Sequence, residues 1–133
     1  MDDWIGWHCL PEDRYLWYNR RRNAGKPVRV GEALPPYKTL VMCKQGYHAS
    51  RKLRDALCYA PGPTACVVRL EGRVIDKADK SVGQGRVALA MVDATRELRL
   101  FAAWCAAKAL QAERAAGREP DSRSWAAVRT AVR

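Results

Sequence analysis

The Pro61-Gly62-Pro63 tripeptide constrains the fold of this chain most, because it separates a helical pattern from a strand pattern at a fixed point. Proline cannot continue a helix, and it restricts the residue before it. Ahead of the tripeptide, apolar residues recur at the i, i+3, i+4 spacing of one helical face: Leu53, Ala56 and Leu57. Behind it, residues 64–70 alternate and are rich in β-branched side chains. We therefore expect a helix at 51–59, capped by Ser50, and then a strand.

Similar patterns predict the rest of the secondary structure. Short apolar or alternating runs predict strands at residues 4–10, 14–18, 28–30, 40–43, 64–70 and 73–76. Residues 86–92 fit a strand or a helix by periodicity alone. An apolar stripe predicts a long amphipathic helix at 94–116 with Asp93 as its cap, and Pro120-Asp121 begins a short helix after it.

The length of 133 residues suits one domain with one hydrophobic core. We expect a single α+β domain at 1–117, in which the helices at 51–59 and 94–116 pack on a small, mostly antiparallel sheet. Residues 118–133 form a basic helical extension. The expected core residues are Leu53, Leu57, Val67, Leu70, Leu98, Phe101 and Cys105.

The five cysteines are an odd number at long, irregular spacings, without the C-x-x-C pair that is typical of zinc or redox centres. They are Cys9, Cys43, Cys58, Cys66 and Cys105. Buried, reduced thiols are the simplest interpretation. No apolar run approaches the roughly 20 residues of a membrane span, so we expect a cytoplasmic protein that does not engage a membrane.

The positive charge predicts an anionic partner. The 24 Lys and Arg residues against 14 Asp and Glu give a net charge of +10, which favours nucleic acid, a nucleotide or an acidic protein surface. Residues 14–29 contain basic residues and no acid, with aromatic side chains between them, which is a composition that pairs phosphate contact with base stacking. The alternative is a β-hairpin with core aromatics and solvated arginines. The candidate binding residues are Arg14, Tyr15, Trp17, Arg20, Arg21, Arg22, Lys26, His48 and Arg51.

His8 and His48 are the only histidines, so any catalysis that needs an imidazole must use one of them. No Ser-His-Asp spacing accompanies either histidine, and neither has a metal ligand four residues later. A structural role is the simpler interpretation for each, and we expect no metal site.

Five motifs carry a resemblance to a family of small uncharacterised domains found in phage and prophage proteins. They are the segments 46–50, 55–59, 67–72, 79–80 and 93–95, within a match over residues 7–104. The resemblance implies a strand at 86–92 and a phage-encoded protein in the host cytoplasm. It carries no activity with it, because its motifs are turn and core residues.

A second resemblance concerns the order of histidine and tyrosine residues. A histidine on a first strand, the turn at 46–50 leading into a helix, and a tyrosine at the end of that helix are similar to the ADP-ribosyltransferase pattern. In that family a first-strand histidine and a tyrosine hold NAD, and a late glutamate orients the ribose. Here Asp93 or Glu97 stands in for the glutamate. The resemblance implies these catalytic residues: His8, Tyr47, Tyr59 and Asp93.

These observations leave two functions. The first is a non-enzymatic phage or prophage binding protein that needs no cofactor and engages an anionic partner. A counter-defence role would follow, such as trapping a nucleotide signal or blocking a nuclease complex in the manner of an anti-CRISPR protein. The alternative is an NAD-dependent enzyme similar to ADP-ribosyltransferases.

Overall fold

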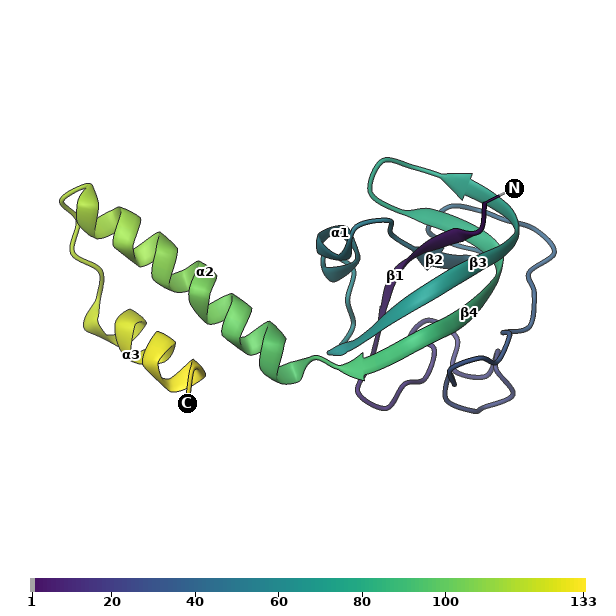
Figure 1. The fold of residues 1–133 in the computed structure, drawn as a ribbon, viewed down its shortest axis with the longest axis horizontal. Helices are drawn as coiled ribbons and strands as arrows, with labels where there is room; N and C mark the ends of the chain where they lie inside the picture. Colours follow the sequence, from purple (N-terminus) through teal and green to yellow (C-terminus); the bar gives the residue numbers. More distant parts are fainter. Residues whose placement is uncertain (1) are drawn as a thin grey trace. The chain divides into compact units, whose positions relative to one another are not determined.

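Four antiparallel strands form one sheet in the order β1-β3-β4-β2 (Figure 1). The computed structural model describes residues 2–133. The strand bounds are Trp4–Leu10 for β1, Tyr47–Ala49 for β2, Thr64–Asp76 for β3 and Ser81–Asp93 for β4. The predicted α+β class with a small antiparallel sheet is thus confirmed.

β3 and β4 form a long hairpin at the centre of the sheet. They pair from Thr64 opposite Asp93 to Asp76 opposite Ser81. The expected runs at 64–70 and 73–76 are therefore one strand, bent at Gly72, whose φ of 71° suits glycine. Residues 86–92 are strand, and they belong to an element that begins earlier than expected.

Side chains on β3 alternate between a buried and a less buried face, as the two-residue period of a strand requires. The buried set is Thr64, Cys66, Val68 and Leu70. The prediction of Leu70 as a core residue is correct. The prediction of Val67 is wrong, because an odd-numbered residue of this strand points to the opposite face, where it is only half-buried.

Residues 11–46 cover the buried face of the sheet as one long connection without regular strands (Figure 1). Three of its apolar side chains join the core: Leu16, Val28 and Leu34. The strands expected at 14–18, 28–30 and 40–43 are absent from this part of the chain. Arg14 and Cys43 have φ angles of 65° and 67°, a left-handed conformation that a strand does not accommodate.

The connection binds to β4 through its backbone. Gly31 N–H donates to Ala88 O at 2.8 Å, and Leu34 N–H donates to Arg86 O at 3.1 Å. β2 pairs only with residues 81–83 of β4, so this segment satisfies the part of the strand that β2 does not reach.

The helix α1, Leu53–Leu57, is shorter than the expected 51–59. Ser50 does not cap it. Instead, Ser50 exchanges backbone hydrogen bonds with Trp7 at 2.7 and 2.8 Å, which draws residues 47–50 into the sheet. Ala56 is the buried residue of the helix, whereas Leu53 is exposed and Leu57 half-buried, contrary to the expected core.

The chain from Ala94 to Arg133 forms a second compact unit, separate from the unit that ends at Asp93. It contains α2, Thr95–Ala115, and α3, Ser122–Ala131, so both expected helices are present. The boundary between the units therefore follows Asp93, whereas the sequence suggested residue 117. The packing of α2 on the sheet stays a prediction.

The two helices contact each other along one side of this unit. The Arg114 guanidinium lies 4.6 Å from the centre of the Trp125 ring, and it also pairs with Glu119 at 2.9 Å. The α3 cap is Asp121, which accepts a hydrogen bond from Arg123 N–H at 2.8 Å. The N-cap position of α2 is Ala94, one residue later than expected.

Several residues of α2 and several cysteines that were expected to be buried are exposed. In α2, Phe101 and Cys105 are exposed and Leu98 is half-buried. Cys9 and Cys66 are buried, as expected, but Cys43, Cys58 and Cys105 are not.

Within residues 2–133, neither α2 nor any other helix has the length and apolar character needed to cross a membrane.

Candidate functional site

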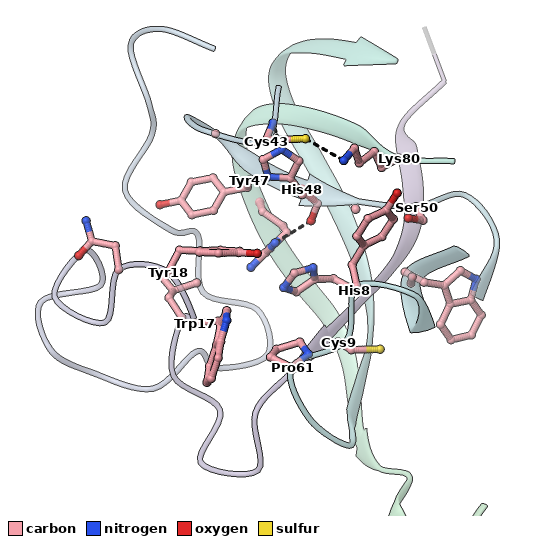
Figure 2. A pocket seen from close by; sticks show the side chains of 18 of the residues that line it. His8, Cys9, Trp17, Tyr18, Cys43, Tyr47, His48, Ser50, Pro61 and Lys80 are labelled. Atoms are coloured by element: carbon pink, nitrogen blue, oxygen red, sulfur yellow. Dashed lines mark hydrogen bonds between the residues drawn. The ribbon is translucent and has the colours of Figure 1, made fainter. Parts of the chain in front are cut away.

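A pocket of about 220 Å³ lies between β1, β2 and the covering connection, all in the first unit (Figure 2). Six of the side chains that line it are aromatic: Trp7, Trp17, Tyr18, Tyr37, Tyr47 and Tyr59. Three are basic: Lys44, Lys80 and Arg86. Both histidines line it too, and no Asp or Glu of the described residues does. The lining therefore favours an anion that also presents an apolar or aromatic surface.

Arg86 carries the buried charge of this pocket. It lies on β4, on the face that the connection covers, and its exposed fraction is only 3%. Its Nη1 donates to the backbone carbonyl of His48 at 2.7 Å, and its guanidinium lies 5.3 Å from the centre of the Tyr47 ring. Among residues 2–133, no carboxylate forms an ion pair with it.

Burial lowers the pKa of Arg86 to about 10, so the side chain stays protonated at neutral pH. Burying a charge without a partner carries an effective cost of several kcal/mol. A carbonyl and an aromatic face offset part of that cost. An anion in the pocket would offset much more of it.

Both histidines of the pocket are neutral at pH 7. Burial lowers the pKa of His8 well below its usual value, and the charge of Arg86 lowers it further. Burial and then Lys80 and Arg86 lower the pKa of His48. His48 Nε2 accepts a hydrogen bond from Cys43 N–H at 2.9 Å, so this nitrogen carries no proton. The formal charge of the pocket thus comes from its Arg and Lys residues.

The opening of the pocket is aromatic. The exposed fraction is 58% for Trp17 and 95% for Tyr18, in contrast to the buried Tyr47. Figure 2 shows these two side chains on one side of the pocket and His8 and Pro61 across from them. The connection positions them because Leu16, their neighbour in sequence, is fixed in the core.

Lys80 is held at another part of the pocket rim. Its Nζ lies 2.7 Å from Cys43 Sγ and 4.6 Å from the centre of the Tyr59 ring. The hydrogen bond with Cys43 raises the pKa of Lys80, and the Tyr59 hydroxyl donates to the Asp79 carboxylate. These contacts fix a second positive charge near the pocket.

The structure brings only part of the predicted binding set together. Trp17 and His48 line the pocket. The others lie elsewhere: Arg14, Tyr15, Arg20, Arg21, Arg22, Lys26 and Arg51. Arg22 is used within the fold, since it donates to the Tyr47 hydroxyl at 3.0 Å and lies 3.3 Å from the centre of the Tyr37 ring.

Two further arginines of this set have internal contacts. Arg20 pairs with Asp13 at 2.9 Å and lies over Tyr15. Arg51 lies over Trp4, with its guanidinium 4.7 Å from the ring centre. Arg20 and Arg22 therefore make separate contacts within the fold.

Three of the four residues implied by the ADP-ribosyltransferase resemblance do lie together. His8, Tyr47 and Tyr59 line the pocket, from β1, β2 and the turn after α1. Asp93 does not line it; it is the last residue of β4, opposite Thr64. The pocket described here thus has the aromatic and imidazole groups of that pattern without its carboxylate.

Sequence reasoning missed Arg86, which is the main charge of the site. The signal was present, because Arg86 is the one charged residue of the run 81–92. A single charge within an apolar central strand is rare unless it has a partner or a function. The clustered basic residues of the sequence lie in the covering connection instead, within residues 14–29.

No protein-family model, curated protein or solved structure matches this chain. Within residues 2–133, no group of three or more His, Cys, Asp and Glu side chains is placed to hold a metal ion.

Proposed function

We propose that this protein is a non-enzymatic binding protein that holds a small anionic ligand in the pocket, with Arg86 as its counter-charge. The observation that carries the proposal is an arginine, Arg86, that is 3% exposed and has no carboxylate partner among residues 2–133. Folding has already removed Arg86 from water, so the desolvation cost of this charge lowers the stability of the folded protein before any ligand binds. An incoming anion therefore gains attraction to this charge without that part of the cost.

The shape of the site favours a small ligand over a nucleic-acid strand or an acidic protein surface. A concave pocket with a few polar groups and many aromatic ones is typical of small-molecule sites. The net charge of +10 would attract such an anion at long range. In a phage or prophage setting, trapping a nucleotide signal is the counter-defence role that fits this pocket, whereas blocking a nuclease complex would require a surface.

A thermal-shift titration with pyrophosphate tests the proposal. Pyrophosphate should raise the Tm of the wild-type protein progressively, because a ligand that binds only the folded state stabilises it by mass action. Arg86→Met should abolish the shift. Arg21→Met removes an exposed charge outside the pocket and is the matched control. Equal shifts in all three proteins would show that Arg86 does not hold the anion.

An NAD-dependent enzyme similar to ADP-ribosyltransferases is the second candidate, and the shared position of His8, Tyr47 and Tyr59 in the pocket favours it. Such a transferase stabilises positive charge that develops on the ribose, which requires a carboxylate. No carboxylate of the described residues lines this pocket, so the binding function has the stronger support. Release of nicotinamide from NAD by the wild type, lost in His8→Ala, would reverse this order.

A further inference from the structure

The two ends of the pocket differ in chemistry. At the inner end, the buried Arg86 lies close enough to His8 for its charge to lower the pKa of that imidazole. At the opening, Trp17 and Tyr18 expose more than half of their surface, 58% and 95%. A ligand that uses both ends must carry an anion at one end and a flat apolar ring at the other.

The inner end suits a phosphate. A guanidinium offers five N–H donors, and the hydrogen bond from the Arg86 side chain to His48 uses Nη1. Elsewhere in the pocket lining, His48 accepts at Nε2, so its Nδ1 carries the ring proton. Several donors around one cation match the several oxygens of a phosphate. No Asp or Glu of the described lining would repel it.

The opening suits a nucleobase. Stacking on aromatic side chains is favourable for every base, because each has a π-face. A ligand ring that stacks on the exposed aromatic side chains at the edge of the pocket would bury their apolar surface. The volume of about 220 Å³ is below the several hundred cubic ångströms of typical drug-sized sites, so it suits one nucleotide better than two.

We propose that the pocket takes a mononucleotide, with its phosphate on Arg86 and its base stacked against Trp17 and Tyr18. This inference rests on the proposed function and adds the class of ligand and its orientation. The stacking contact discriminates nucleotides from other phosphates, and it tolerates different bases.

Isothermal titration with AMP, CMP, ribose 5-phosphate and adenosine tests the inference. In the wild type, AMP and CMP should bind at least about tenfold more tightly than ribose 5-phosphate, since stacking adds to the phosphate contact. Adenosine should bind more weakly than AMP. Trp17→Leu should lower the affinity for AMP far more than the affinity for ribose 5-phosphate, and so remove the advantage of AMP.

Two variants serve as controls. Trp17→Phe keeps an aromatic face and should restore most of the advantage of AMP. Trp104→Leu changes a tryptophan with the same exposed fraction, 58%, in the other unit, and it should bind as the wild type does.

The outcomes separate the inference from the proposed function. Equal affinities for AMP and ribose 5-phosphate would overturn the stacking and leave the anion site intact. Adenosine binding as tightly as AMP would overturn the phosphate position on Arg86. If neither pyrophosphate nor any of these phosphates binds, the proposed function itself is wrong.

Discussion

Arg86 Nη1 donates a hydrogen bond of 2.7 Å to the backbone carbonyl oxygen of His48, which joins the buried charge of β4 to the neighbouring strand β2. This bond fixes the guanidinium beside His48, whose pKa is lowered by burial and then by the charges of Lys80 and Arg86. The arrangement buries one permanent positive charge beside the imidazoles of the pocket, and the first two predictions depend on it.

Arg86→Met should not destabilise the protein in the absence of anions. Replacing a buried charge by an apolar side chain of similar volume is often neutral or stabilising, by about 1–4 kcal/mol. The lost hydrogen bond and the contact with the Tyr47 ring oppose this gain. We expect a free energy of unfolding within about 1 kcal/mol of the wild type or above it, measured by urea unfolding in a chloride buffer of low ionic strength. A decrease of more than about 3 kcal/mol would mean that Arg86 holds the fold together.

The stability of the anion-free protein should decrease as the pH falls below about 6.5, the usual pKa of histidine. The pKa values of His8 and His48 are lowered in the folded state, so the unfolded chain binds more protons in this range. A state that binds more protons is favoured by acid, and here that state is the unfolded one.

Urea unfolding between pH 7.5 and 5.0 measures this slope. His8→Gln should flatten it, because the larger lowering of pKa belongs to His8. A stability that rises toward pH 5 in the wild type would contradict the neutral state of these imidazoles.

Gly46 should not tolerate a side chain. Its φ is 122°, and an added Cβ would lie 2.3 Å from Val82 Cγ2 and 2.8 Å from Leu40 Cδ2. Gly46→Ala should therefore lower the free energy of unfolding by more than about 3 kcal/mol, through strain and overpacking together.

Gly25→Ala is the matched control, since its φ is 68° and nothing lies within 4 Å of the added Cβ. It should cost only the left-handed backbone penalty of about 1–2 kcal/mol. Similar losses in both variants, measured by urea unfolding, would show that the close contacts at Gly46 are relieved at little cost.

Sequence patterns predicted the helices and strands that neighbouring residues in the sequence determine. β1 follows a short apolar run that stops at Pro11, β3 follows alternation, and α2 and α3 follow helical periodicity with clear end signals. β2 was predicted as a turn before a helix, because its strand character comes from its pairing with residues 81–83 of β4, far along the chain. A backbone hydrogen bond between residues far apart in the chain leaves no local pattern to recognise.

The sequence predicted only some residues of the candidate site, those that residue type alone singles out. His8, His48 and Trp17 were identified from residue type, and the fold brings all three to one pocket. Arg86 was not identified, because its significance depends on burial and on the missing carboxylate partner, and both arise only after β4 is covered by the connection. The arginines near residue 20 were predicted to bind the ligand because they are clustered in the sequence. Arg22, however, donates to the Tyr47 hydroxyl from outside the pocket.

Isothermal titration of pyrophosphate into the wild type and Arg86→Met tests the anion site most directly. At low ionic strength, the wild type should bind one equivalent, and the affinity should weaken as salt is added. Arg86→Met should lose at least about tenfold in affinity while it keeps the circular dichroism spectrum of the wild type. An affinity that is unchanged in Arg86→Met would contradict the assignment of this buried guanidinium as the counter-charge of the ligand.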